Sequence, residues 1–172
     1  MRALILEELE VMQHWLRGTS TDPLEMFWPR GAHVDENTAR NRIVERLQPR
    51  LEALDASVVI EHHMAQGNRC DFTAAKVLDG RRRLLVCEVK GQWHPQLYTA
   101  AAEQLDKHYA IHPDAARQGI YLALWFGPDE KVANRKKHRI KSAQELKAAI
   151  LQRMPPDLLG FIDVFVLDLS KP

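Results

Sequence analysis

An acidic residue, Glu88, and a lysine, Lys90, lie two positions apart in an apolar run that is typical of a β-strand. Side chains alternate between the two faces of a strand, so both groups project to the same face. The dipeptide Asp79-Gly80 is typical of a two-residue hairpin turn, and a hairpin closed there places Asp71 directly opposite Glu88. The sequence therefore predicts two carboxylates and an ammonium group on one face, whereas a turn one residue longer moves Asp71 to the other face.

Facing carboxylates repel each other unless a cation lies between them. A metal ion bound by Asp71 and Glu88 provides that cation, and an all-oxygen ligand set favours Mg²⁺, with Mn²⁺ as a substitute. Such an ion acidifies a bound water and holds a phosphate group, while Lys90 orients or helps to deprotonate the water. The expected chemistry is hydrolysis of a phosphodiester bond, and the alternative is a buried structural salt-bridge cluster.

The same residues resemble a known family. Asp71 followed by Glu88-Val89-Lys90 is similar to the D…(D/E)xK core of the PD-(D/E)XK nuclease superfamily, which includes restriction endonucleases. The flanking segments look like a bacterial branch of that superfamily: GNRCD at 67 to 71, EVKGQWH at 88 to 94, Gln104-Leu105 with Tyr109, and GIYLALWFG at 119 to 127. The likeness covers roughly residues 35 to 127, and Cys70 takes the place of the proline that usually precedes the aspartate.

The resemblance implies a role for each motif residue. Asp71, Glu88 and the backbone carbonyl of Val89 are expected to hold the metal ion. Lys90 is expected to activate water, and Gln104, on the following helix, is expected to line the site.

A further acid is expected because the resembled fold often adds a glutamate from the helix before the first strand, and the sequence offers Glu36 and Glu45. Glu36 lies seven residues before Ile43 and shares the face of Ile43 and Leu47, which must turn toward the sheet. Glu45 points away from that face. Glu36 is therefore predicted as a further metal ligand and catalytic residue, and the alternative is charge compensation in the first helical turn.

A basic segment follows the motif region. Six of the eleven residues from 131 to 141 are Lys or Arg, and none is acidic. We expect this segment to bind the phosphate backbone of a nucleic acid, and the alternative is a solvated loop. Trp93 and His94 could also touch substrate by stacking or phosphate contact. The candidate nucleic-acid-binding residues are Lys131, Arg135, Lys136, Lys137, Arg139, Trp93 and His94.

The hydrophobic periodicity predicts the elements that position these residues. Helices are expected over residues 3–16, 35–54, 97–111 and 142–154, and strands over 57–63, 71–78, 84–90, 119–126 and 161–169. Pro49 predicts a kink or break near Gln48, and the apolar run at 119–126 predicts a strand covered on both faces. The fold class is α/β, a restriction-endonuclease-like α/β/α sandwich around a mixed sheet of about four to five strands.

Length and composition allow one domain over residues 1–172, since 45% of the residues are hydrophobic. Within it we distinguish an N-terminal helix and connecting segment (1–34), the motif core (35–127), and a basic segment with a helix and a final strand (128–172). The net charge of +1 excludes a globally basic nucleic-acid binder. No secretion signal and no apolar run of about 20 residues occurs, so a cytoplasmic protein without membrane contact is expected.

The sequence thus predicts a Mg²⁺-dependent endonuclease whose substrate is DNA, with RNA as the less favoured alternative. A catalytically silent nuclease fold that serves as a nucleic-acid or protein interaction module is the main alternative. An RNA-processing or toxin nuclease is another. A homodimer and a place in a larger defence, repair or toxin system also stay open.

Overall fold

The computed structural model of the protein describes residues 1–18, 22–63, 69–109 and 112–171. In these ranges one mixed sheet has the strand order β1-β2-β3-β4-β5. Strands β1 (Ser57–Ile60), β2 (Phe72–Leu78) and β3 (Arg81–Gly91) are antiparallel, and β4 (Gly119–Trp125) and β5 (Ile162–Asp168) run parallel to β3.

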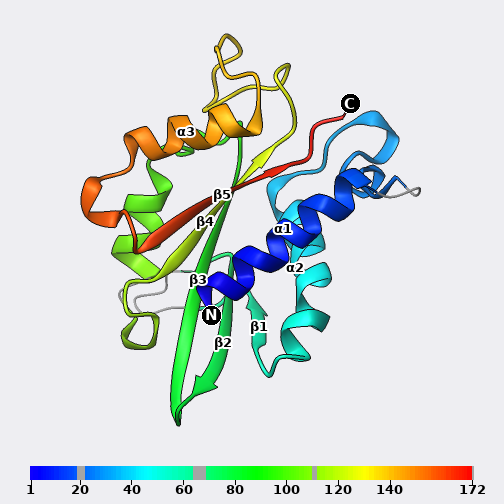
Figure 1. Ribbon diagram of the computed structural model, residues 1–172. Helices are drawn as coiled ribbons and strands as arrows, with labels where there is room; N and C mark the ends of the chain where they lie inside the picture. The colour runs from blue at the N-terminus through cyan, green and yellow to red at the C-terminus, as the bar shows by residue number, and fades with distance from the viewer. Residues whose placement is uncertain (19–21, 64–68, 110–111, 172) are drawn as a thin grey trace.

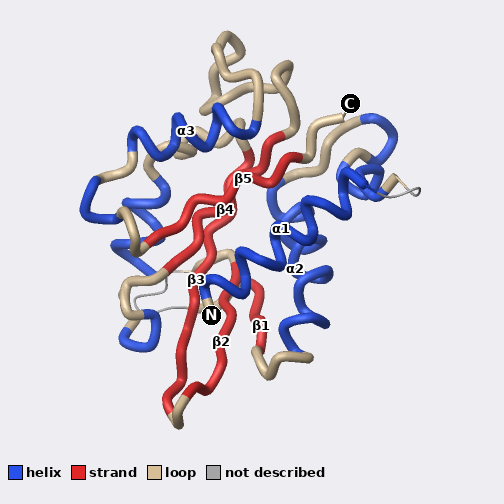
Figure 2. Tube along the Cα trace, in the orientation of Figure 1, coloured by secondary structure: helices blue, strands red, loops and turns tan. Residues whose placement is uncertain are grey.

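Helices cover both faces of the sheet (Figures 1 and 2). Helices α1 (Arg2–Gly18) and α2 (Glu36–Glu52) lie on one face, and the wide π-type helix η4 (Ala101–Tyr109) and α3 (Ala143–Arg153) lie on the other. Short 3₁₀ turns are η1 (Pro23–Phe27), η2 (Pro29–Gly31), η5 (Pro113–Ala115) and η6 (Pro156–Leu158). The predicted α/β sandwich around a mixed sheet is confirmed.

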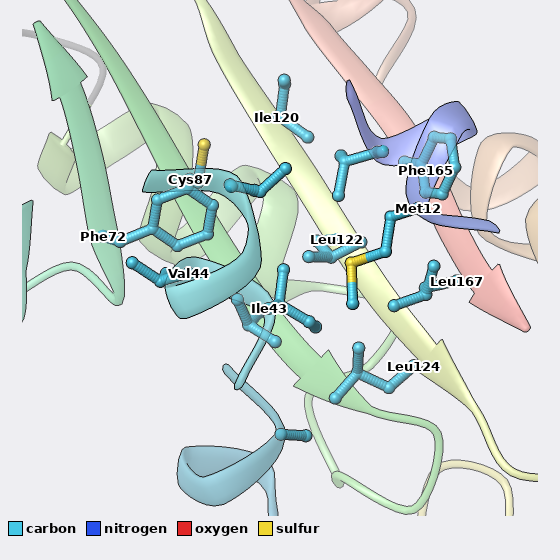
Figure 3. Close-up of a cluster of buried hydrophobic side chains, with 14 of the residues drawn as sticks. Met12, Ile43, Val44, Phe72, Cys87, Ile120, Leu122, Leu124, Phe165 and Leu167 are labelled. Atoms are coloured by element: carbon cyan, nitrogen blue, oxygen red, sulfur yellow. The ribbon is translucent and has the colours of Figure 1, made fainter. Parts of the chain in front are cut away.

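Strand β4 shows why the sheet needs both layers. All of its residues are buried, and alternate residues belong to different apolar clusters. Ile120 and Leu122 pack with Met12 and Ile43 on the α1 and α2 side (Figure 3), whereas Tyr121 packs into the cluster on the α3 side. The prediction of a strand covered on both faces is confirmed.

The β2–β3 hairpin has the register that the Asp79-Gly80 dipeptide predicts. Leu78 pairs with Arg81 and, at the other end of β2, Phe72 pairs with Cys87. Asp79 and Gly80 both adopt left-handed backbone conformations, with φ of 52° and 71°, as a two-residue hairpin turn requires. Asp71, the residue before β2, is therefore opposite Glu88.

Helix α2 positions the acidic residues of its first turn. Asp35 caps it by accepting a hydrogen bond of 2.9 Å from the amide of Thr38, and this bond lowers the pKa of Asp35.

Helix α2 continues past Pro49 to Glu52, so the expected break near Gln48 is wrong. Pro49 lies in the last turn, where its missing amide removes only one hydrogen bond.

Three other boundaries differ from the predicted ones by three residues or more. Strand β1 stops at Ile60, three residues short of His63, and β3 begins at Arg81, three residues before Leu84. The helix expected over 97–111 is regular only as η4, because turns occupy residues 95–99, and residue 111 lies outside the described ranges. Within those ranges, none of the helices combines the length and apolar character needed to cross a membrane.

Candidate active site at the open edge of β3

The pairing of β3 with β2 ends at Cys87, which lies opposite Phe72, the first residue of β2. Strand β3 continues for four more residues, to Gly91. Its amides at alternate positions face the edge that β2 leaves uncovered. The amide of Val89 donates to Asp71 Oδ2 at 2.8 Å, and the amide of Gly91 donates to Glu36 Oε2 at 2.7 Å. Two carboxylates thus take the place of a strand partner, and these bonds fix where they lie.

Lys90 lies among three carboxylates beside this edge. Its Nζ is 2.5 Å from Glu88 Oε1, 3.7 Å from Glu36 Oε1 and 3.8 Å from Asp71 Oδ2. It also donates to the carbonyl oxygen of Val89 at 3.1 Å. The side chain of Lys90 is 7% exposed, so the charged groups meet in a partly desolvated site.

The placement of Glu36 and Glu45 agrees with the helix phase read from the sequence. Glu36 reaches Gly91 and Lys90 from the first turn of α2, whereas Glu45 is exposed. The structure therefore brings together four predicted residues, Asp71, Glu88, Lys90 and Glu36, with the Val89 carbonyl. We call this set the acidic cluster.

Arg40 is a fifth charged member that the sequence reasoning missed. Its side chain is 5% exposed, and it bonds to Asp71 Oδ1 at 3.2 Å and to Glu61 Oε1 at 3.1 Å. The available signal was its position, four residues after Glu36 and three before Ile43, on the inward stripe of α2. A charged residue on a buried stripe needs a charged partner.

Negative charge exceeds positive charge in this region. Glu36, Asp71 and Glu88 surround one ammonium, and Arg40 is shared between Asp71 and Glu61. Arg69 also pairs with Glu61, so four carboxylates meet three cations. Burial, reinforced by the charge of Asp71, raises the pKa of Glu88 from 4.5 to about 7, although Lys90 opposes this. Excess carboxylate is the electrostatic condition for binding a further cation.

Burial tends to lower the pKa of Lys90, but the charges of Glu88, Asp71 and Glu36 raise it above its ordinary value. Lys90 is therefore held as a cation. Burial raises the pKa of the Cys70 thiol to about 12, and both Cys70 and Cys87 are buried free thiols. Neither thiol is suited to nucleophilic chemistry.

The fit of a metal ion depends on Lys90. Among the residues with described positions, no group of three or more His, Cys, Asp or Glu side chains is arranged to hold a metal ion. The donors in the acidic cluster are nonetheless all oxygen, the type that Mg²⁺ prefers. The Lys90 ammonium lies between them, so these donors fit a metal ion only when that ammonium moves away from Glu88.

The other residues expected at the site lie around it. The Gln104 amide donates to Gln96 Oε1 at 3.0 Å rather than to the cluster, and the side chain of Tyr109 lies outside the described part of the chain. His94 is within electrostatic reach of Glu36: burial lowers its pKa and the Glu36 charge opposes this. Gln104 therefore hydrogen-bonds outside the acidic cluster, whereas His94 lies near the acids of the cluster.

Trp93 contributes to packing next to the site. Its ring stacks on His33 with 4.4 Å between centroids and packs against Phe126. A Cβ at Gly91 would lie 2.6 Å from the Trp93 ring, so glycine is needed at the end of β3. With Glu130, Lys131 and Asn134, among other residues, Trp93 and His33 line a shallow cavity of about 360 Å³.

Gln92 attaches the basic segment to β3, a role the sequence reasoning did not assign. Its side chain is fully buried, donating to Gly127 O at 2.9 Å and accepting from Phe126 N at 2.5 Å. Its carbonyl accepts from the amide of Ala133 at 2.8 Å. Within this segment, Lys131 is half-buried, and the exposed basic members are Arg135, Lys136, Lys137, Arg139 and Lys141.

Comparison with known proteins identifies the family of the chain. The family model of a domain of unknown function (DUF8371) matches residues 1–128. This is more than half of the 172 residues, so the chain belongs to that family. No curated protein matches the chain. No solved structure matches it either.

Proposed function

We propose that this member of the DUF8371 family is a metal-dependent nuclease that hydrolyses phosphodiester bonds of DNA. The observation that supports this most is the meeting of three carboxylates with Lys90 at the open edge of β3. Hydrogen bonds donated by backbone amides of β3 hold Asp71 and Glu36 in place before any ligand binds. Such pre-positioning is what catalysis by charge stabilisation requires.

The ligands for Mg²⁺ would be Asp71, Glu88, Glu36 and the carbonyl of Val89. Mg²⁺, or Mn²⁺ in its place, would supply Lewis acidity and a water of lowered pKa. Arg40 would keep Asp71 oriented, because it bonds to the second oxygen of that carboxylate. Lys90 must leave Glu88 for this arrangement, and its mobile stem allows that.

Lys90 would act as a cation rather than as a general base. Its pKa is raised by the surrounding acids, so it stays protonated near neutrality. A protonated Lys90 donates hydrogen bonds, and it would orient the attacking water or stabilise charge on the scissile phosphate. Of the two roles considered for Lys90, orientation is therefore the one we propose.

The basic segment would hold the phosphate backbone. Lys136, Lys137 and Arg139 are exposed, and cations of this kind add affinity without sequence preference. Replacing all three by Gln is expected to weaken binding to every sequence alike. The slope of log K against log salt should fall by up to about 2.7, at about 0.9 for each phosphate that is no longer neutralised.

The direct test is incubation with plasmid DNA and with RNA, with and without Mg²⁺ or Mn²⁺. The wild type should cut DNA only with metal, and Lys90→Ala should cut at least 100-fold more slowly. Lys147→Ala, which removes an exposed lysine on α3, serves as the control and should cut normally. Equal cleavage by wild type and Lys90→Ala would remove Lys90 from the reaction.

The second candidate is a silent interaction module. The observation in its favour is the 2.5 Å ion pair between Lys90 and Glu88, which neutralises part of the negative charge of the cluster without a metal ion. Titration with Mn²⁺, followed by electron paramagnetic resonance, separates the two. Saturable binding that is lost in Asp71→Asn supports the nuclease, whereas absent binding together with absent cleavage supports the module.

A further inference from the structure

A second charged region lies apart from the acidic cluster, where the segment linking β4 to α3 folds over the end of the sheet (Figure 1). A cavity of about 530 Å³ opens between this segment, the turn after β3 and the C-terminal end of α3. Its lining includes five basic or potentially basic side chains, and no acid: Arg135, Lys137, His138, Arg139 and Arg153. We call it the basic cavity.

Most of the positive charge in the basic cavity is unneutralised. Among the described residues, the side chains of Arg135, Lys137 and Arg139 have no ion-pair or hydrogen-bond partner. Arg153 donates to the carbonyl of Ala149, and its guanidinium lies 4.3 Å from the centre of the Tyr98 ring. Four cations around one hollow repel each other unless an anion joins them.

His138 adds an unsatisfied polar atom to this lining. Its Nε2 lies 2.8 Å from the carbonyl oxygen of Glu130, so Nε2 carries the proton and donates. Its Nδ1 is buried and has no hydrogen-bond partner within the described part of the chain. Because Nε2 carries the proton, Nδ1 can only accept a hydrogen bond, and a phosphate dianion offers only acceptor oxygens. His138 therefore shapes the lining, and the arginine and lysine side chains are the groups that would hold an anion.

The charge and size of the hollow indicate which anion it takes. A phosphodiester carries one negative charge, whereas a phosphomonoester carries about 1.5 to 2 and presents three acceptor oxygens. Arginine forks bind such oxygens in pairs. The volume lies within the range of small-molecule sites. We propose that the basic cavity binds a phosphomonoester dianion, carried by the end of a nucleic-acid strand or by a free nucleotide.

The basic cavity lies on the same face of the sheet as the side chains of Glu88 and Lys90. Leu84 and Val86 of β3 belong to the apolar cluster that also holds Val132 of the cavity lining, and alternation puts Glu88 and Lys90 on that face. A strand anchored by its terminal phosphate would therefore approach the acidic cluster. This strand-end role rests on the proposed nuclease function, whereas dianion binding does not.

The test measures binding without metal and uses no cleavage. Fluorescein-labelled oligonucleotides with a 5′-phosphate, a 3′-phosphate or hydroxyl ends are titrated by anisotropy. Adenosine monophosphate and adenosine are titrated by calorimetry. The wild type should bind one phosphorylated probe at least tenfold more tightly than its hydroxyl counterpart. Preference only for the phosphorylated oligonucleotide assigns a strand end, and preference only for the monophosphate assigns a free nucleotide.

Variants identify the site. Arg139→Gln and Arg153→Gln should each reduce the phosphate preference at least fivefold, while Lys147→Gln, the same charge change at an exposed position on α3, should retain it. Arg139 is exposed, so its variant is expected to stay folded even if removing the Arg153 guanidinium from the Tyr98 ring unfolds the other. Equal binding of phosphorylated and hydroxyl probes, or a preference that survives Arg139→Gln, overturns the proposal. Lys90→Ala should keep the preference, so failure of cleavage and failure of this site are distinguishable.

Discussion

Replacing Glu88 with Gln should alter the dependence of stability on pH. The pKa of Glu88 rises from 4.5 to about 7 in the folded protein, mainly through burial. Between these two pKa values, Glu88 keeps its proton in the folded state and has released it in the unfolded state. The stabilising contribution is complete below pH 4.5 and is lost as the pH rises through about 7. Gln carries no proton equilibrium and removes this dependence.

The magnitude follows from the same shift. A rise from 4.5 to about 7 corresponds to on the order of 3 kcal/mol, since each pKa unit is worth about 1.4 kcal/mol. The Glu88 side chain is 4% exposed, so solvent screening removes little of this. Losing the partner of Lys90 adds a constant offset, because Lys90 stays charged throughout the range.

Urea unfolding of metal-free protein between pH 4.5 and 8 measures the effect. The stability of Glu88→Gln relative to wild type should increase by roughly 2 to 3 kcal/mol across this range. Glu45→Gln, at an exposed position of α2, is the control and should give a nearly constant difference. A flat difference for Glu88→Gln, or one that changes in the opposite direction, would show that burial does not hold Glu88 protonated.

Three further results are expected. Glu36→Gln should slow cleavage at least tenfold, equivalent to about 1.4 kcal/mol of transition-state stabilisation, while Glu45→Gln changes the rate little; the reverse ranking would contradict the assignment of Glu36. Gly91→Ala should lower the free energy of unfolding by about 1 to 3 kcal/mol, because its Cβ meets the Trp93 ring at 2.6 Å, and unchanged unfolding would refute the clash. Arg40→Met should cost about 2 kcal/mol in urea unfolding, since it removes the buried cation that Asp71 and Glu61 share, and a neutral effect would show that Lys90 and Arg69, which also lie beside these carboxylates, are sufficient.

The part of the site that depends on local geometry could be predicted from the sequence. The Asp79-Gly80 turn fixes the register of β2 against β3, and strand alternation then puts Glu88 and Lys90 on one face. Helix phase separates Glu36 from Glu45 in the same way. Both rules use distances along the chain, so no knowledge of tertiary packing is needed.

The part that depends on contacts between distant segments could not. Arg40 bonds to Asp71, thirty-one residues later, and Gln92 bonds to Gly127, thirty-five residues later. Nothing in the local pattern selects these partners. The basic segment shows the same limit, since its charges were evident but Arg153 and Tyr98, which complete the cavity with it, come from other elements.

The energetic cost of the acidic cluster is itself an argument about its role. A structural salt bridge between β3 and α2 needs one carboxylate for each cation, yet Lys90 has three carboxylates within 4 Å. Ionising Glu88 at neutral pH opposes folding by on the order of 3 kcal/mol, and a glutamine would keep the shape without that cost. A divalent cation changes the balance, because it favours the ionised form and turns the repulsion into coordination. Mg²⁺ should therefore raise the melting temperature of the wild type more at pH 8 than at pH 5, and much less in Glu88→Gln. If Mg²⁺ shifts both proteins equally at both pH values, Glu88 is not a metal ligand and the cluster is structural.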